Sequence, residues 1–159
     1  MGIQVAVCGP RSCTPADERH ARIVGELLAD AGAVVICGGG DGVMAAVAAG
    51  VTAKGGIVIG IRPNGSREGA SPDLTATIVT NMGEARNAII VWSADAVISI
   101  GGSWGTLNEV ALAMSRGETP VVALGGWQVI AQDGTPVAGI QYVSAPDDAV
   151  RIALRSKSG

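Results

Sequence analysis

A glycine-rich segment in the last third of the chain is the part best suited to bind phosphate. It follows an apolar stretch typical of a buried strand and precedes a stretch with helical spacing. Glycines let backbone N–H groups approach an anion, and the free amides and dipole of a following helix favour its charge. A tight packing turn without a ligand is the bland alternative. The predicted phosphate-binding residues here are Gly101, Gly102, Ser103, Trp104, Gly105 and Thr106.

Glu109 stands three residues after Thr106, and two interpretations of that spacing are open. Thr106 could cap a helix with Glu109 at its third position, as in a capping box. Alternatively, the carboxylate could face a ribose beside the phosphate, where it would orient a water molecule or stabilise an oxocarbenium-like sugar. Arg86 precedes the strand that leads into this segment. A lone arginine of this kind is usually a solvated surface group.

Two further glycine-rich segments, residues 8–12 and 38–42, also follow short apolar runs. In both segments a contact with phosphate or sugar is open beside a role in loop geometry. For Trp104, stacking on a base and a place in a subunit interface are equally open. The candidate ligand-binding residues in these two segments are Gly9, Arg11, Ser12, Gly39 and Gly40.

The elements that must position these residues alternate along the whole chain. Continuously apolar strands between helices indicate a parallel sheet covered on both faces. The fold class is therefore α/β, a Rossmann-like three-layer α/β/α arrangement with a mainly parallel sheet. Loops that follow parallel strands emerge at one edge, so the three glycine-rich segments should converge there. Strands are predicted over 3–7, 33–37, 56–61, 76–80, 95–100, 119–124 and 140–143. Helices are predicted from Thr14 and Pro15 to 32, over 43–53 and 84–92, from about 107 to 117, and over 146–155. Residues 125–139 are left open as a loop or a hairpin.

Length and composition set limits on the function. The 159 residues fit a single domain over 1–159, and a hydrophobic share of 48% argues against disorder. A net charge of −3 without a Lys/Arg run argues against nucleic acid as a partner. No apolar run approaches membrane-spanning length and no leader is visible, so we expect a cytoplasmic protein without a membrane partner.

Several kinds of cofactor and nucleotide site are disfavoured. Three cysteines and one histidine without paired spacing make a metal site improbable. The chain lacks a Walker Gly-Lys-Ser/Thr and a dinucleotide fingerprint. Neither Lys54 nor Lys157 has the surroundings that pyridoxal phosphate needs. We therefore expect no cofactor, and a mononucleotide or similar small phosphorylated ligand as the partner.

The residues from Arg86 to Glu109 resemble the LOG family, the cytokinin-activating phosphoribohydrolases often mislabelled lysine decarboxylases. That family's signature is an arginine followed, after a helix and a strand, by P-G-G-x-G-T-x-x-E. The resemblance implies hydrolysis of the N-glycosidic bond of a nucleoside 5′-monophosphate such as AMP, which releases the base and ribose 5-phosphate. It also implies a catalytic pair, Arg86 and Glu109, a phosphate cradle over Gly102–Thr106, and a homo-oligomer (a dimer or a dimer of dimers). The positions that match without a gap are Arg86, Asp95, Gly102, Gly105, Thr106 and Glu109.

The chain departs from the LOG pattern at four places. Gly101 replaces the proline, Ser103 the second glycine and Asn87 the lysine after the arginine, while Met82 is one residue out of register with the family's methionine. Asn87 and Met82 are counted among the nucleotide-binding residues by the same resemblance. The glycine-rich version is more similar to a neighbouring branch that includes the molybdenum-cofactor carrier proteins. The alternative function is accordingly a non-catalytic carrier or sensor of a nucleotide or of molybdenum cofactor.

Overall fold

The computed structural model describes residues 2–155, which contain seven strands and five α-helices. The strands are β1 (Gln4–Cys8), β2 (Val34–Cys37), β3 (Ile57–Arg62), β4 (Ala76–Val79), β5 (Ala96–Ile100), β6 (Val121–Leu124) and β7 (Ile140–Val143). The helices are α1 (Pro15–Asp30), α2 (Val43–Ala53), α3 (Arg86–Trp92), α4 (Trp104–Arg116) and α5 (Pro146–Arg155), and a short 3₁₀ turn, η1 (Gly83–Ala85), precedes α3. Every predicted strand and helix is present, with ends shifted by a few residues at most.

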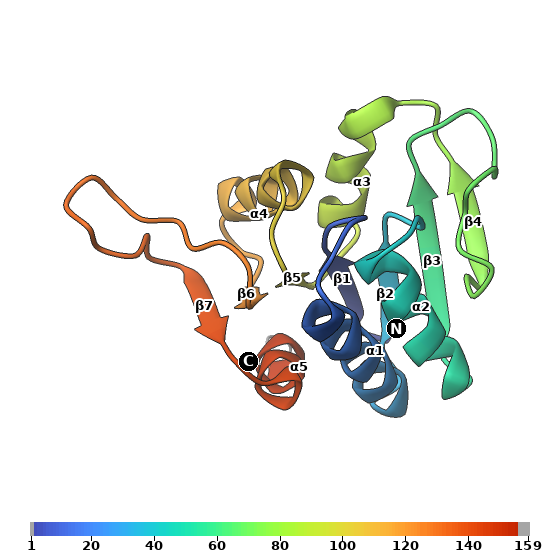
Figure 1. The fold of residues 1–159 in the computed structure, drawn as a ribbon, viewed down its shortest axis with the longest axis horizontal. Helices are drawn as coiled ribbons and strands as arrows, with labels where there is room; N and C mark the ends of the chain where they lie inside the picture. The colour runs from blue at the N-terminus through green and yellow to red at the C-terminus, as the bar shows by residue number, and fades with distance from the viewer. Residues whose placement is uncertain (1, 156–159) are drawn as a thin grey trace.

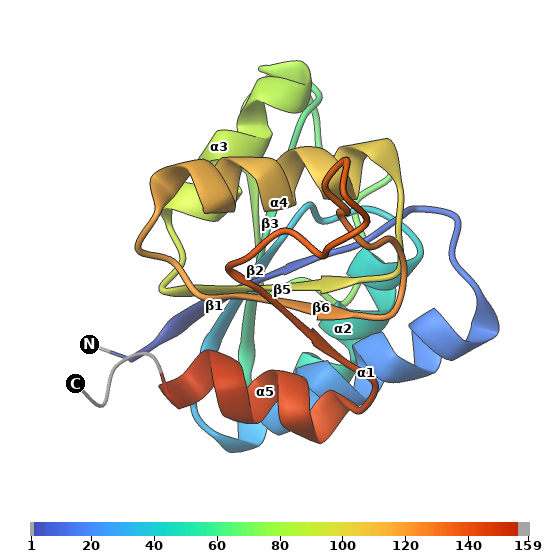
Figure 2. The same ribbon diagram turned by 90° about the vertical axis from the view of Figure 1, so that its left-hand side faces the viewer.

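All seven strands pair in parallel in the order β4-β3-β2-β1-β5-β6-β7, which confirms the Rossmann-like fold class. The helices α1, α2 and α5 cover one face and α3 and α4 cover the other (Figures 1 and 2). The central strands β5 and β6 are buried along their whole length, because every second side chain meets a helical layer on either face. Two apolar clusters result, one under each helical layer.

The first helix begins as its sequence predicts. Thr14 caps α1, with its hydroxyl accepting from the backbone N–H of Asp17 at 3.1 Å, and Pro15 fills the first helical position. The helix then packs very closely on α2 through glycines. A side-chain carbon at Gly25 would collide with the backbone carbonyl of Val47, so only glycine permits this approach.

The three glycine-rich loops meet at the carboxyl edge of the sheet, as predicted. The strand order reverses direction between β1 and β5, and the loops after these strands flank that switch point. A side-chain carbon at Gly9 would stand 2.6 Å from the carbonyl oxygen of Ile100, and one at Gly42 would collide with the carbonyl of Arg11. The loops are therefore in direct backbone contact with one another.

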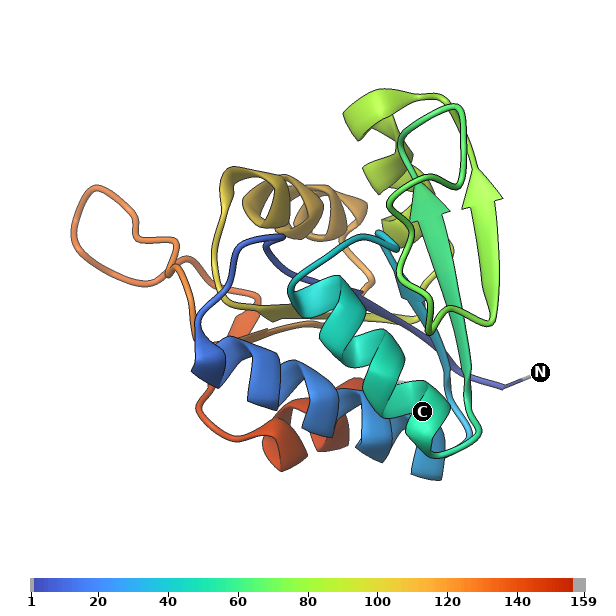
Figure 3. The same cartoon turned by 45° about the vertical axis from the view of Figure 1, so that its right-hand side comes forward.

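Residues 125–139 form a hairpin-like arm beyond β6. A single antiparallel bridge joins Ile130 to Pro136, and the backbone N–H of Val137 donates to the carbonyl of Val129 at 2.9 Å. The arm extends away from the helical layers before the chain returns to β7 (Figures 1 and 3). Of the two structures left open by the sequence, the hairpin is the one observed.

Candidate functional site

The predicted phosphate loop leads directly into α4, but the helix begins earlier than expected. Ser103 is the N-cap and Trp104 the first helical residue, with the Ser103 hydroxyl accepting from the N–H of Thr106 at 3.2 Å. The capping box with Thr106 as cap and Glu109 at the third position is therefore wrong. Both Ser103 and Thr106 can cap a helix, and the cap falls on Ser103 because its backbone is extended (φ −159°, ψ 168°).

Because α4 begins at Trp104, hydrogen-bond donors at its N-terminus are available to an anion. The N–H groups of Trp104 and Gly105 lie in the first turn of α4, where no intrahelical acceptor exists. The hydroxyls of Ser103 and Thr106 are 2.9 Å apart, so one of them donates to the other. One hydroxyl hydrogen therefore remains for a ligand. We call these four residues, Ser103 to Thr106, the cradle.

A cleft of about 160 Å³ opens beside the cradle and brings most of the predicted residues together. Its walls come from the loop after β1, from the start of α2, from η1 and α3, and from α4. It is lined by Gly9, Pro10, Arg11, Met44, Glu84, Arg86, Asn87, Ser103, Gly105, Thr106 and Glu109. Both residues of the predicted catalytic pair are thus in the cleft.

Arg86 is buried, with 8% of its surface exposed, so the interpretation as a solvated surface group is wrong. One terminal nitrogen, Nη1, donates to the carbonyl oxygens of Gly38 at 2.9 Å and of Ile61 at 2.5 Å. Arg86 thereby ties α3 to the loop after β2 and to the end of β3. Its Nε has no hydrogen-bond partner within residues 2–155. Arg86 thus lines the cleft with part of its donor capacity unused.

Glu109 lies in the second turn of α4 and is 7% exposed. Burial raises the pKa of its carboxyl group from 4.5 to about 7, although Arg86 and a hydrogen bond with the Cys8 thiol both act to lower it. The carboxyl group is therefore poised between its two protonation states near neutral pH. Burial, followed by the charge of Glu109, also raises the pKa of Cys8 well above its usual range, so this thiol stays protonated.

Asn87 links two helices at the cleft. Its side-chain amide donates to Asn108 at 2.9 Å and to Glu84 at 3.3 Å. Its amide oxygen, in contrast, is buried without a hydrogen-bond partner in the described residues. Asn87 therefore joins α3 to α4 as a hydrogen-bond donor.

The other predicted residues lie outside the cleft. Met82 is 50% exposed at the start of η1 and Trp104 is 78% exposed on α4. Gly39 and Gly40 pack against the side chain of Arg62. The remaining three, Ser12, Gly101 and Gly102, line a groove next to the cleft.

Two residues at this edge of the sheet were missed from the sequence. Arg62, at the end of β3, is 4% exposed and donates to the backbone carbonyl of Glu68 at 3.1 Å. Burial, then the neighbouring Arg86 and Arg11, lowers its pKa, which shows that three guanidinium groups gather here. Trp127, from the arm, lies over the turn at Gly101 and Gly102. Trp127 follows a glycine pair, Gly125-Gly126, that comes directly after a buried strand. This pattern could have predicted a fourth loop at the carboxyl edge of the sheet.

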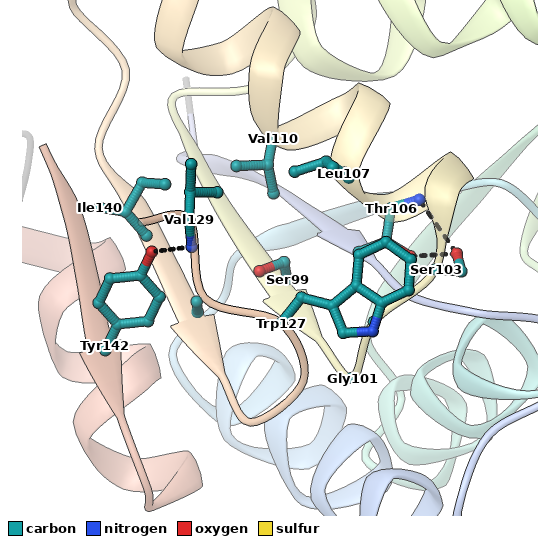
Figure 4. A pocket seen from close by; sticks show the side chains of 12 residues that line it. Ser99, Gly101, Ser103, Thr106, Leu107, Val110, Trp127, Val129, Ile140 and Tyr142 are labelled. Carbon is teal, nitrogen blue, oxygen red and sulfur yellow. Dashed lines mark hydrogen bonds between the residues drawn. The ribbon is translucent and has the colours of Figure 1, made fainter. Parts of the chain in front are cut away.

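A small pocket lies under Trp127 on the other side of the cradle (Figure 4). Val110 and Leu107 of α4 and Ile140 of β7 give it apolar walls, and the hydroxyl of Tyr142 accepts from the N–H of Val129 at 3.0 Å. Its volume of about 20 Å³ is enough for a single water molecule. The arm therefore packs against α4 here, and the pocket between them has no space for a ligand.

Metal, lysine and membrane features can be placed as well. Among residues 2–155, no three His, Cys, Asp or Glu side chains are grouped so that they could hold a metal ion. Lys54 pairs with Asp30 at 3.2 Å, at the opposite ends of α2 and α1 from the loops, and Lys157 lies outside the described residues. No described helix has the length and apolar character to cross a membrane.

Fold and site together define a class of protein. The chain is a Rossmann-like α/β protein whose cradle and cleft lie at the carboxyl edge of the sheet, next to the switch point. Comparison with known families makes this specific: residues 2–150 match the SLOG cluster4 family, and the chain belongs to it. A protein of Archaeoglobus fulgidus is 40% identical over 154 residues, which cover 97% of this chain and 96% of the relative.

Two solved structures are similar over almost their whole length. The molybdenum cofactor binding protein of Rippkaea orientalis has a TM-score of 0.86 at 32% identity, over 95% of this chain and 94% of that one. The molybdenum cofactor carrier protein of Chlamydomonas reinhardtii has a TM-score of 0.85 at 25% identity, over 99% of both chains. The sequence resembles the LOG family, and the family model assigns the chain to the SLOG cluster4 family. Its fold is similar to those of the molybdenum cofactor carriers.

Proposed function

We propose that this protein binds a small phosphorylated heterocycle of the molybdenum cofactor type and carries it without chemical change. The observation that carries the proposal is the cradle, whose first-turn amides and one hydroxyl adjoin a cleft lined by Arg11 and Arg86. A helix N-terminus with nearby guanidinium groups is a favourable environment for a phosphate. The similarity to proteins that bind molybdenum cofactor supports this ligand class.

Binding can be tested with molybdenum cofactor released from a purified molybdoenzyme. We expect the protein to retain the pterin and the metal through gel filtration and to protect the cofactor from oxidation. Arg11→Ala should weaken binding, because Arg11 lines the cleft and is free of side-chain hydrogen bonds in the described part of the chain. The matched control is Arg19→Ala, an exposed arginine of α1 that lies outside the cleft. Equal loss in both variants, or no retention by the native protein, would contradict a carrier function.

The second candidate is the hydrolysis of a nucleoside 5′-monophosphate. It is favoured by one observation, the buried Glu109 with a pKa of about 7 in the same cleft as Arg86 and the cradle. In this role Arg86 would hold the nucleotide, and the Glu109 carboxylate would orient water or stabilise positive charge on the ribose.

Turnover is tested by incubating the protein with a panel of monophosphates that includes AMP and by measuring the free base. Hydrolysis predicts release of base and ribose 5-phosphate, lost in Glu109→Gln while binding persists. Absence of base release across the panel would exclude this candidate and leave the carrier function untouched.

A further inference from the structure

Trp127 is held over the turn at Gly102 by the backbone at the root of the arm. Gly126 has φ +78°, and a side-chain carbon there would collide with the carbonyl of Gly101. The indole of Trp127 follows immediately, so close to Gly102 that any side-chain carbon on Gly102 would collide with it. Figure 4 shows the ring lying beside Ser103 and Thr106 of the cradle. The position of this indole is thus determined by two backbone contacts.

A second tryptophan stands next to it. The rings of Trp104 and Trp127 are in edge-to-face contact, with centroids 5.0 Å apart and an interplanar angle of 78°. Trp127 is 45% exposed and Trp104 78% exposed, so both present large apolar faces to solvent. The third tryptophan, Trp92, lies under the guanidinium of Arg116 at the far end of α4. The first two form an aromatic surface at the start of α4, directly beside the cradle.

A groove of about 490 Å³ runs beside this aromatic surface and shares only Pro10 with the Glu109 cleft. Trp127, Gly101 and Gly102 form one side, and Ser12, Thr14 and Asp17 form the other. Pockets that hold drug-sized ligands measure roughly 300–1,000 Å³. The groove is within this range, whereas the cleft of about 160 Å³ is below it. A planar ring system therefore fits the groove but not the cleft, and the indole of Trp127 distinguishes the groove from other surface hollows of similar volume.

The charge in the groove selects which end of a ligand enters it. Oδ2 of Asp17 accepts from the N–H and the hydroxyl of Thr14, at 3.2 and 2.8 Å. Oδ1 makes no hydrogen bond in the part of the chain that the structure describes. The carboxylate repels a phosphate, and its free oxygen can accept an N–H at the edge of a ring.

We propose that the groove binds the ring system of the phosphorylated ligand, stacked on Trp127, while the phosphate occupies the cradle. The inference rests on the proposed function and makes it specific. The ligand is a phosphorylated, N–H-bearing planar heterocycle such as a pterin. Trp127 supplies the stacking face, Trp104 supports it edge-on, and Asp17 accepts from the ring.

D-neopterin 3′-phosphate is a suitable probe, because it has a pterin ring and a phosphate and fluoresces by itself. Its affinity is measured by equilibrium dialysis, with inorganic phosphate and ribose 5-phosphate as competitors that lack the aromatic ring (ring-free in this sense). If the ring stacks on the indole, Trp127→Leu should weaken the binding of neopterin phosphate by roughly tenfold or more. The affinity for the ring-free phosphates, measured by competition, should change by less than about twofold, since the cradle is intact. Trp104→Leu should give a smaller loss in the same direction.

Trp92→Leu is the matched control and should bind as the native protein does. If Trp127→Leu keeps the native affinity for neopterin phosphate, or if ring-bearing and ring-free phosphates bind the native protein equally, the stacking site is overturned while the phosphate site stands. If the native protein binds none of the three phosphates, the proposed function fails with it. Emission from Trp104 and Trp127 that shifts with protein concentration and not with the probe would identify this surface as a contact between copies, which also overturns the inference.

Discussion

Burial raises the pKa of Glu109 to about 7 even though the guanidinium of Arg86 shares its cleft. One terminal nitrogen of Arg86 donates to two backbone carbonyls. Arg86 and Glu109 make no ion pair with each other in the described structure. The carboxyl group thus stays largely desolvated with only part of the compensation that a close cation would provide. This arrangement makes Glu109 the residue whose protonation most strongly couples the site to pH.

The free energy of unfolding should therefore fall as the pH rises towards the raised pKa of Glu109. Between pH 4.5 and about 7 the folded protein holds a proton on Glu109 that the unfolded chain has released, so the free energy of unfolding decreases with pH. The total effect is on the order of 3 kcal/mol above pH 7. Glu109→Gln removes it, and the variant should be the more stable protein at pH 8 and similar to the native protein at pH 5. Urea unfolding at both pH values measures this, with the exposed Glu118→Gln as control. Parallel pH profiles for the native protein and Glu109→Gln would contradict the assignment.

The N-cap of α4 should be needed for both folding and binding. Ser103→Ala removes the acceptor for the N–H of Thr106 and should lower the free energy of unfolding by about 1 kcal/mol. Phosphate affinity should fall as well, because the ordered first turn presents the amides. Denaturant unfolding and phosphate titration check the two effects, and Ser12→Ala, at an exposed serine outside the cradle, should leave the stability unchanged.

The end of α3 should depend on a residue of α4. One terminal nitrogen of Arg116 donates to the carbonyls of Val91 and Ala94, at 2.9 and 2.7 Å, and the guanidinium lies 5.0 Å from the ring centroid of Trp92. Arg116→Ala loses these contacts and should cost about 2 kcal/mol in unfolding free energy. Arg151→Ala, which removes an exposed pair with Asp148, is the control and should cost well under about 1 kcal/mol. Similar losses in the two variants would refute a capping role for Arg116.

Two glycines with positive φ should differ in their tolerance of alanine, and Gly42 should tolerate it less because of both its backbone (φ +63°, ψ −126°) and its crowding. Gly42 and Gly55 both have positive φ, +63° and +70°, but a side-chain carbon at Gly55 meets open space whereas one at Gly42 collides with the carbonyl groups of Arg11 and Pro10. Gly55→Ala should cost about 1 kcal/mol, the conformational penalty alone. Gly42→Ala should cost clearly more and should also disturb binding, because the loops after β1 and β2 must separate. Thermal unfolding of both variants decides this, and equal shifts would argue against the loop contact.

Elements and their convergence could be predicted from the sequence because each signal is local. Apolar runs fixed the strands, Thr14-Pro15 the start of α1, and the glycine clusters the loops at the carboxyl edge. The start of α4 was predicted too late, since Ser103 and Thr106 are equally good caps by type and only the extended backbone at Ser103 decides between them.

The site was predicted in part for a related reason. Residues within the matched segment, such as Arg86 and Glu109, reached the cleft, whereas Arg62 and Trp127 come from segments outside it. Their approach depends on the pairing of β3 with β2 and on the return of the chain after β6, which are tertiary features. Burial of Arg86 was likewise invisible, because its partners are backbone carbonyls 25 and 48 residues away.

The backbone contact between Gly126 and Gly101 has a mechanical consequence. Beyond its root, the arm is held together by one bridge and by backbone hydrogen bonds among its own residues. A displacement at the root, in contrast, must push directly on the glycine turn that precedes α4. A push on the arm near Trp127 would therefore reach the first turn of α4 directly through the backbone.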